Sequence, residues 1–534
     1  MAKVGWSGLL AVVLGLTGCG VTEVRQRADL RALAERLDAI ETVRLAEQSK
    51  SEPVTIEEAT KELAAQAADP NEMKPATELT LEEVRVAALK NNLGLKAELI
   101  DPAVAQQGVE EAQAAFEWIL FGSGRYLHSE SDDGDTSSSR FYETGVTAPL
   151  QTGGSVVVST PISETSGGVS EADVSVRYIQ SLLRDAGARI NTHPIRIAMY
   201  SKGAVDATTK LGAINILAGA DIAYWRLYSA RKELDVSREQ HKLAQNQLHN
   251  AHAKVEAGSA PRNEIVRAEA GLAVRLEYMI NAETNVRDRE RDLKRIMNRP
   301  DMPLISQVGI LAVTDPDPRG LDLDAEQLAA AALANRMELA AIEFRLAQDE
   351  IGVELARNAL LPRLDLDYTY LAGGQSHTVG RAFEDTFGDP AQDHHVGLSA
   401  AIPLGNRAAK ARLRRVRLQR VQRKVDRDQW RQRIRQEVYE ALDGMQQTWR
   451  RILAAEQGLV RAYRAYEVEQ SQFQLGRRNS TDVLIAADRL ADAQLRRISA
   501  FVDYEIAQVL LARSTGVLLG QGQVPLQPAT LEGK

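Results

Sequence analysis

The chain of 534 residues carries the same seven-residue pattern of mostly apolar side chains twice, and each time the pattern continues on both sides of a glycine. Every position of the second copy lies 218 residues after its counterpart. The first copy comprises Leu227, Leu234, His241, Leu248 and Val255 before Gly258, and Ile265, Leu272, Met279, Val286 and Leu293 after it. The second copy comprises Met445, Ile452, Leu459, Tyr466 and Phe473 before Gly476, and Val483, Leu490, Arg497, Tyr504 and Leu511 after it. Because this spacing keeps one helix face against a partner helix, each copy predicts a long helix, a tight reversal and a returning helix. Two such hairpins favour the wall of a tube or a helical bundle over the core of an enzyme.

The first helix of each hairpin is unusually long. The segments Asp185–Arg189 and Pro403–Arg407 correspond at the same offset of 218. From each of them, about 70 residues run to the turn glycine, and at 1.5 Å per residue such a helix measures about 100 Å. A soluble domain has no use for a helix of that length.

A second correspondence, at an offset of 244 residues, lies ahead of each hairpin. It matches Ala87–Leu89 with Ala331–Leu333, within apolar patterns that predict amphipathic helices of about 40 residues. Thr80, with Glu83 three positions later, predicts a capping box at the start of the first helix.

Alternating sequence follows each of these helices and predicts β-strands of the length that spans the wall of a membrane barrel. In the second half, the strands fall within residues 363–403, as two strands separated by a Gly-, His- and Asp-rich loop. In the first half, the strands fall within residues 121–183, and the segment between Phe116 and Gly187 that holds them is 26 residues longer than its counterpart in the second half. The additional sequence includes Thr144–Pro161, whose centre Gln151–Gly154 predicts a turn between two more strands. The sequence leaves open whether this hairpin joins the same barrel.

The N-terminus has the pattern of a processing signal. Lys3 supplies a positive charge, Leu9–Leu16 an apolar core, and Leu16–Cys19 the small-residue pattern of a bacterial lipoprotein cleavage site. We therefore expect residues 1–18 to be a signal peptide and Cys19 to carry a covalent lipid; the alternative is a free thiol after an ordinary signal peptide. Cys19 is the only cysteine, which excludes an intrachain disulfide. Residues 19–78 are polar and predict a lipid-anchored tether that contains one helix.

Taken in this order, the motifs resemble the TolC-like family of outer membrane efflux proteins, in its lipoprotein branch. The resemblance covers about residues 79–518. It rests on the Leu-Thr-Leu-Glu-Glu opening at Leu79, on Asn335–Leu339, on Pro403–Arg407, and on an acidic residue six positions after each turn glycine. Gly20 after the cysteine is, in this family, typical of sorting to the outer membrane.

The resemblance implies a mainly α fold with a β-barrel part, in which the two repeats contribute long coiled-coil hairpins to one helical tunnel. It implies a homotrimer that closes the barrel in outer membrane lipid. The expected divisions are a first repeat at 79–299, a linker at 300–324, a second repeat at 325–518 and a C-terminal tail at 519–534. The implied function is a passive export channel that works with a periplasmic adaptor protein and an inner membrane transporter.

The resemblance also assigns roles to the hairpin tips. It implies that the loops at Gly258, Ser259, Gly476 and Arg477 dock onto the adaptor. Asp482 matches an aspartate of a ring at the tunnel constriction, where three identical carboxylates favour cations. The matched partners, which hold neighbouring hairpins together when the channel is shut, are Arg478 and Glu264.

This sequence departs from the family pattern at two positions near the tip. Ile485 replaces a second aspartate one turn further on, and Phe473 replaces a tyrosine, so we expect a single acidic ring and a looser closed state. The simpler interpretation of Glu264 and Asp482 is that acidic residues are favoured in the first turn of any helix, where they interact with the helix dipole.

Other features of the sequence bear on different functions. Residues Lys410–Arg435 contain twelve Lys or Arg and two acids, which fits a solvated helix face or contacts to anionic lipid headgroups. The net charge of −8 and pI of 5.7 argue against a nucleic-acid partner. Adjacent histidines on a strand, as in Asp393–His395, point to opposite faces, so neither they nor His128 and His377 predict a metal site. His241 occupies a seam position and is expected to face the core or the tunnel.

No catalytic motif and no cofactor other than the lipid on Cys19 are expected. The alternative from a different class is a periplasmic adaptor or a coiled-coil scaffold lipoprotein, because adaptors also carry long helical hairpins. An adaptor usually has one hairpin inserted in compact β domains, whereas this chain has two.

Overall fold

The computed structural model describes residues 54, 56, 58–59, 76–130, 136–165, 169–475, 477–478 and 480–521. The chain divides into two units, Met1–Glu72 and Met73–Lys534. The second unit holds all the elements discussed below. The expected signal peptide, Cys19, nearly all of the tether, the tip glycine Gly476 and residues 522–534 lie outside the described residues.

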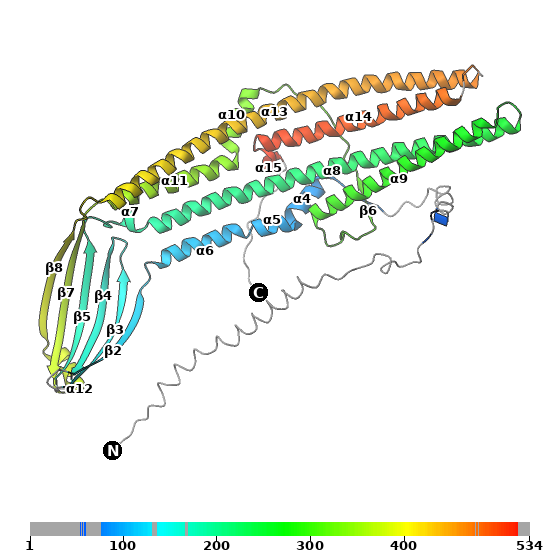
Figure 1. The fold of residues 1–534 in the computed structure, drawn as a ribbon. Helices are drawn as coiled ribbons and strands as arrows, with labels where there is room; N and C mark the ends of the chain where they lie inside the picture. Colours follow the sequence, from blue (N-terminus) through cyan, green and yellow to red (C-terminus); the bar gives the residue numbers. More distant parts are fainter. Residues whose placement is uncertain are drawn as a thin grey trace. The chain divides into compact units, whose positions relative to one another are not determined.

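The two predicted hairpins are present as two pairs of long helices (Figure 1), and a short turn joins the first pair. The helices that follow the two turns have the same length of 35 residues. Between the hairpins, α8 packs along α14. The first hairpin consists of α8 (His193–Glu256) and α9 (Asn263–Met297), and the second of α13 (Arg407–Gln474) and α14 (Ser480–Ser514).

The seven-residue seam forms the core of each hairpin. Leu227 and Leu293 are completely buried in one cluster with Tyr224, and Met445 and Tyr504 are buried in the second hairpin. His241 is 3% exposed on α8, as its seam position predicts. Burial of these side chains in the seam helps to explain why helices of this length hold together pairwise.

The shorter helices differ from the prediction of two continuous helices of about 40 residues. Both are interrupted, because local hydrogen bonding and backbone geometry end the helix. The side chain of Asn92 accepts a hydrogen bond from the Leu95 N–H (3.1 Å) and starts a new helix, and Pro102 stands in the first turn of another. Arg336 has extended geometry between two helices of the second repeat. The segments are α4 (Leu81–Asn91), α5 (Leu93–Glu98), α6 (Asp101–Ala114), α10 (Ala325–Asn335) and α11 (Met337–Asn358).

The capping box at the start of α4 is confirmed. The Thr80 hydroxyl accepts from the Glu83 N–H (3.2 Å), and the Glu83 carboxylate accepts from the Thr80 N–H (2.8 Å). These bonds satisfy two amides that a helix start otherwise leaves unpaired, so the first repeat begins at a defined residue.

The strands form one six-stranded antiparallel sheet in the order β2-β3-β4-β5-β7-β8. The turn predicted at Gln151–Gly154 is confirmed, with Gly153 at φ 91°. The additional hairpin of the first half is therefore part of the sheet and contributes two of its central strands. The strands are β2 (Ile119–Glu130), β3 (Thr136–Pro149), β4 (Gly154–Thr165), β5 (Val169–Ser181), β7 (Arg363–Ser376) and β8 (Ala391–Ala401).

Other elements were not predicted. The expected linker 300–324 contains β6 (Gly309–Ala312), which pairs in parallel with β1 (Ala76–Leu79) and so ties the linker to the start of the first repeat. The loop predicted between the last two strands contains α12 (Val379–Gly388). The remaining helices are the short α7 (Ala188–Asn191) and α15 (Leu518–Gln521).

Within the described ranges, no helix is both long and apolar enough to cross a membrane.

Candidate functional site

The sheet has two chemically different faces. Since residues paired across antiparallel strands share a face, the ladders assign every strand residue to one of two sets. On β7, Leu366, Tyr368 and Tyr370 belong to one set, and Asp365 and Asp367 to the other. The same division runs through most of the sheet, with Arg140 and Glu164 in the apolar set and Val157 and Ile179 in the polar set as exceptions. The apolar face includes Leu120, Tyr142, Val146, Val156, Val158, Ile162, Val176, Tyr178, Val396 and Leu398, and the polar face includes Arg125, Glu143, Ser159, Glu171, Asp173, Arg177, Thr369 and Asp393.

The two outer strands of the sheet are β2 and β8, and each pairs with one neighbour. Large apolar side chains remain exposed beside these edges, among them Leu120, Tyr126, Val396 and Leu398. A strand edge has unpaired N–H and C=O groups, which are costly in a lipid environment unless another strand covers them. Taken alone, one chain therefore presents a sheet with two open edges and one apolar face.

The tip between α8 and α9 is a tight reversal. Gly258 has φ 67° and is exposed, and its N–H bonds to the Val255 carbonyl (3.0 Å). The Ser259 N–H and hydroxyl both donate to the carbonyl of Lys254, at 2.9 Å each. These bonds satisfy carbonyls that a helix C-terminus leaves free and fix the exposed loop that was predicted as a docking surface.

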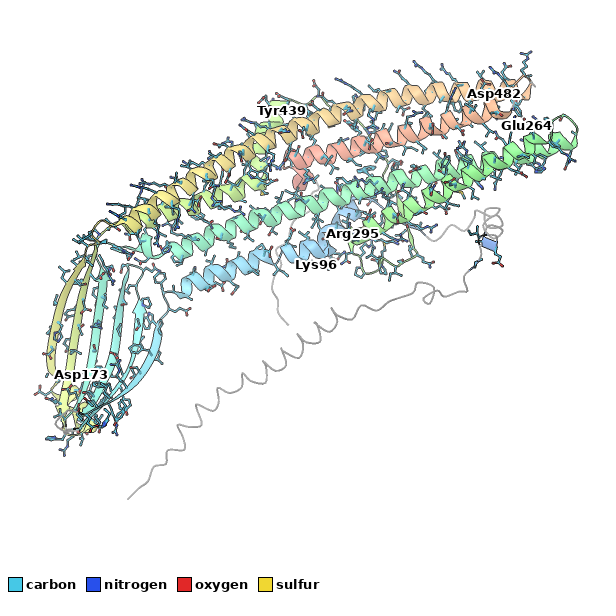
Figure 2. All side chains as sticks on the ribbon, in the orientation of Figure 1. Lys96, Asp173, Glu264, Arg295, Tyr439 and Asp482 are labelled. Carbon is cyan, nitrogen blue, oxygen red and sulfur yellow. The ribbon has the colours of Figure 1, made fainter. Side chains whose placement is uncertain are left out.

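The acidic residues that follow the two turns lie at the hairpin tips (Figure 2). Glu264 pairs with Arg267 on its own helix at 3.4 Å. Arg478 pairs with two acids of the second hairpin, Glu469 at 3.4 Å and Asp482 at 3.8 Å. Within one chain, the structure thus brings together Arg478 and Asp482 of the predicted gate set. Arg477 is exposed beside them, and Ile485 is 44% exposed one turn further along α14.

Two contacts that the sequence did not reveal join the hairpins near their tips. The ammonium group of Lys254 on α8 lies 3.7 Å from the centre of the Phe473 ring on α13, in a cation–π contact. Further from the turns, Arg275 of α9 forms an ion pair with Asp488 of α14. The ring that replaces the family's tyrosine is therefore engaged with the other hairpin. Neither contact was recognisable in the seven-residue pattern, because its partners belong to different hairpins.

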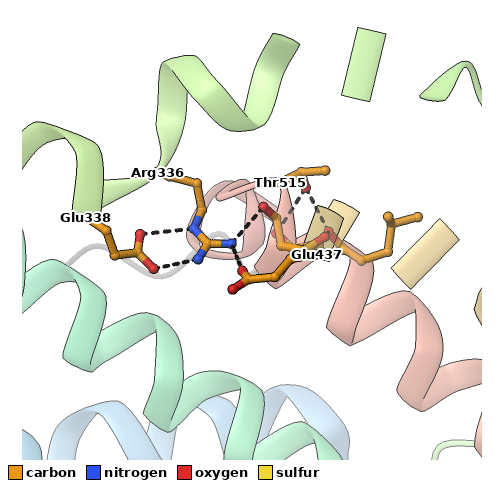
Figure 3. Close-up of polar contacts among 7 residues, drawn as sticks. Arg336, Glu338, Glu437 and Thr515 are labelled. Carbon is orange, nitrogen blue, oxygen red and sulfur yellow. Dashed lines mark hydrogen bonds and ion pairs between the residues drawn. The ribbon is translucent and has the colours of Figure 1, made fainter. Parts of the chain in front are cut away.

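Where the helices are interrupted, an arginine joins several elements. Arg336, 10% exposed, donates two hydrogen bonds to Glu338, at 2.9 and 2.6 Å. It also reaches Glu437 of α13 (2.8 Å) and the Ser514 carbonyl at the end of α14 (3.1 Å), as Figure 3 shows. Burial would raise the pKa of Glu338, but hydrogen bonds from Arg336 and from its own backbone outweigh burial and lower it. This contact explains the Asn335–Leu339 motif as a structural junction.

A second buried ion pair fixes α4 against α8. Arg85 donates two hydrogen bonds of 2.8 Å to Asp221, whose side chain is fully buried. Burial raises the pKa of Asp221 and Arg85 opposes this effect. Burial also lowers the pKa of His241 in the seam of α8.

The basic segment 410–435 lies on α13. Its Arg423 pairs with Asp349 of α11 at 2.5 Å, and Arg420 pairs with Glu350 of the same helix. The two interpretations of this segment, a solvated face and contacts to lipid headgroups, remain predictions.

The histidines of β8 contact different partners. His394 lies against Tyr368, whose hydroxyl is 3.0 Å from its Nδ1, whereas His395 pairs across the ladder with Thr369. Among the residues that the structure describes, no three His, Cys, Asp or Glu side chains gather as a metal ion would require.

The described residues thus combine a two-faced sheet, open at both edges, with two long helical hairpins. Residues 328–517 match the family model "Outer membrane efflux protein". The chain is 24% identical over 317 residues to the outer membrane efflux protein BepC of Brucella suis, a match that covers 59% of this chain and 66% of that protein. It is also 24% identical over 321 residues to the outer membrane protein TolC of Vibrio cholerae, covering 59% of this chain and 70% of that protein.

A solved structure agrees on the fold. The Campylobacter jejuni CmeC outer membrane channel superimposes with a TM-score of 0.64 at 16% identity, covering 82% of this chain and 86% of that one. These similarities to outer membrane efflux proteins agree with the resemblance that the tip and repeat motifs indicated. This similarity favours the channel over the adaptor or scaffold that the sequence also allowed.

Proposed function

We propose that the protein is the outer membrane channel of a tripartite export system, a passive conduit formed by three identical chains. The observation that carries this proposal is the open six-stranded sheet with one apolar face, continuous with hairpins of 64- and 68-residue helices. Copies of the sheet close into a barrel with the apolar face towards lipid. The helices continue the wall as a tunnel on the periplasmic side.

The exposed apolar residues of α13 support contact with further copies. Leu418 and Val425 are seven residues apart and more than half exposed, and Leu453 and Val460 repeat the spacing at 49% exposure each. A seam with this period on the outside of a hairpin matches what a neighbouring helix buries in a coiled-coil wall.

The first test is the mass of the protein extracted from outer membranes in mild detergent. We expect a trimer that dissociates on heating. A monomer, or fractionation with the inner membrane, would contradict a shared barrel and tunnel and would favour an adaptor or scaffold.

In this proposal the two tips dock onto a periplasmic adaptor, which couples the channel to an inner membrane transporter that supplies the energy. The exposed loop at Gly258 and Ser259, together with the segment at Gly476 and Arg477, supplies the contact surface. Near the same tips, three copies of Asp482 form an acidic ring at the constriction, with Arg478 holding each carboxylate in place. Glu264 and Phe473 complete the set of gate residues.

The lipid anchor belongs to the same proposal. Cys19, at the cleavage point of the signal peptide, carries the lipid and attaches the N-terminus to the outer membrane. The variant Cys19→Ala should lose incorporation of a labelled fatty acid, and unchanged labelling would refute the anchor. The position of the trimer in the outer membrane should not depend on this residue, since the barrel itself spans the bilayer.

A further inference from the structure

We propose that three copies of the chain close a barrel of 18 strands, in which β2 of one copy pairs with β8 of the next. This inference rests on the proposed trimer and goes beyond it. The second repeat contributes two strands, β7 and β8, whereas the first contributes four. Two strands from each repeat would make a ring of twelve. The additional hairpin β3–β4 therefore enlarges the ring by half.

The additional hairpin is built as barrel wall along its length. Its β3 strand pairs with β2 over 12 residue pairs and with β4 over 11. Its residues keep the division of faces found elsewhere, with Tyr142, Val146 and Val156 on the apolar face and Glu143 and Ser159 on the polar one. A hairpin lying outside the wall would have no reason to maintain one lipid-compatible face in register with its neighbours.

The two edge strands of the sheet have the relative direction that antiparallel pairing between copies requires. Strands β2 and β8 run in opposite directions because six antiparallel strands are an even number. A β8 edge placed beside the β2 edge of another copy therefore continues the antiparallel pattern around the ring. With three copies, no edge remains open to lipid.

The positions of the strand ends specify how far the end of β8 is displaced, along the strand direction, from the start of β2. Followed across the ladders, Ile119 at the start of β2 lies level with Thr147, Val157, Arg177, Thr369 and His395. From His395, β8 continues for six residues towards the helices, to Ala401. The helix-side ends of β3, β4 and β5 lie between these two levels, and that of β7 lies level with Ala401, so the displacement accumulates across the sheet.

If β2 of the next copy begins opposite Ala401, each copy adds a displacement of six residues, and three copies add 18. A displacement equal to the number of strands corresponds to a strand tilt of about 36°, as in the eight-stranded barrel with a shear of eight. Membrane barrels have tilts of about 35–45°. The chain thus closes at an ordinary tilt without any change in its sheet.

This register also matches the faces. It places Leu120 opposite Ala400 on the apolar side and Phe121 opposite Ser399 on the polar side. Barrels of 16–18 strands leave an aqueous channel. The outer mouth of this channel is therefore wide, and selection among exported molecules falls to the tips of the hairpins.

The test uses pairs of cysteines on the water-filled face and a short thiol-specific cross-linker. Directly opposite residues have Cβ atoms about 4.5–5.5 Å apart, within reach of such a reagent. The double variant Phe121→Cys/Ser399→Cys should convert the monomer band on a denaturing gel into covalent dimers and trimers. Each single variant, treated in the same way, should remain monomeric on that gel.

A second pair tests the smaller ring. In a barrel of twelve strands, each copy would supply the four consecutive strands β4, β5, β7 and β8, and β2 and β3 would stay outside the ring. The strand of the next copy that meets β8 would then be β4, with Val157 opposite Ser399. Cross-linking of Val157→Cys/Ser399→Cys between copies would overturn the inference. A native trimer that lacks the Phe121–Ser399 product would also overturn it while leaving the proposed function intact. A protein that is not a trimer before cross-linking would contradict the proposed function itself.

Discussion

At the scale of single residues, the long helices are positioned by buried charges with partners on other elements. Asp221 is held by Arg85, and Lys294 donates to the Ser306 and Val308 carbonyls at 2.9 and 2.7 Å. The seven-residue seam is repetitive, and a repetitive seam tolerates sliding by one repeat. A buried charge has its partner in one register only. These contacts therefore specify the alignment that the apolar seam leaves open.

Arg336 offers the sharpest test of this role. Replacing it with Gln leaves Glu338, Glu437 and the Ser514 carbonyl without their charged donor, and breaking a buried pair from one side typically costs about 3–5 kcal/mol. We expect a marked fall in the thermal midpoint of the detergent-extracted protein. The matched change Arg319→Gln removes an exposed arginine, 78% exposed and paired with Asp317, and should leave the midpoint unchanged. Equal effects of the two variants would contradict a structural role for the junction.

His241 should make stability sensitive to acid. Because burial lowers its pKa, the folded protein binds a proton less readily than the unfolded chain, and stability is lost as the pH falls through the ordinary value of 6.5. Between pH 7.5 and 5, the thermal midpoint of the wild type should fall more than that of His241→Gln. The control His249→Gln changes an exposed histidine on the same helix and should follow the wild type. Parallel pH profiles for all three proteins would show that His241 does not contribute.

Asp482 tests the acidic ring. In open channels reconstituted in planar bilayers, Asp482→Ala should reduce the preference for cations over anions by about fivefold. That change corresponds to about 1 kcal/mol, the attraction between unit charges 4 Å apart in water. Asp301→Ala, which removes an exposed carboxylate paired with Arg299 beyond the end of α9, should not alter the reversal potential. An unchanged preference in Asp482→Ala would leave only the helix-dipole explanation for this residue.

At the scale of elements, the sequence predicted the helices and strands that depend on a local pattern of residues. The seven-residue seam predicted both hairpins, alternation predicted the strand pairs, and Thr80 with Glu83 predicted a helix start. The breaks at Asn92 and Arg336 were missed, because each depends on a side-chain bond or a backbone angle inside an otherwise helical pattern. The pairing of β1 with β6 joins two four-residue segments more than 200 residues apart, and no local signal identifies such a partner.

The helix α12 was missed for a similar reason. Ten residues rarely form a helix alone, and this segment is helical because it packs against the sheet. Ala382 and Thr386 are buried there, and the Thr386 hydroxyl donates to the Ala172 carbonyl (2.6 Å) and to the Ala382 carbonyl (2.7 Å). Phe383 and Phe387 lie beside each other and remain exposed.

A glycine of β7 makes this packing possible. A Cβ at Gly374 would lie 2.2 Å from the Ala382 carbonyl oxygen, so Gly374→Ala should displace α12 at a cost of about 1–3 kcal/mol. We expect faster hydrogen exchange of the α12 amides. Gly397→Ala on the adjacent strand is the control, because its nearest neighbour outside the local chain would be Asp367 at 3.7 Å, an ordinary contact. Equal exchange in both variants would show that α12 does not depend on this close approach.

At the scale of the whole molecule, the two repeats have diverged at their strands more than at their hairpins. The helices after the turns are equally long, whereas the first repeat has twice as many strands. The hairpins must meet one another and a partner protein at the tips, which restricts their length. The barrel has to close only with further copies of itself, so a pair of strands can be added without disturbing the tips.

A substitution at the tips should therefore impair export without impairing formation of the trimer, which depends on the sheet. Gly258 has φ 67°, where a β-branched residue is strained by about 1–2 kcal/mol, although a side chain there would meet no neighbouring atom. Gly258→Val should distort the reversal and reduce export in cells, while the detergent-extracted protein remains a heat-dissociable trimer. Gly258→Asn should retain export, because asparagine tolerates this conformation. If the Val variant exports as well as the wild type, the loop is not the docking surface. If it fails to form trimers, the tip governs assembly, and the division of labour between barrel and tunnel is wrong.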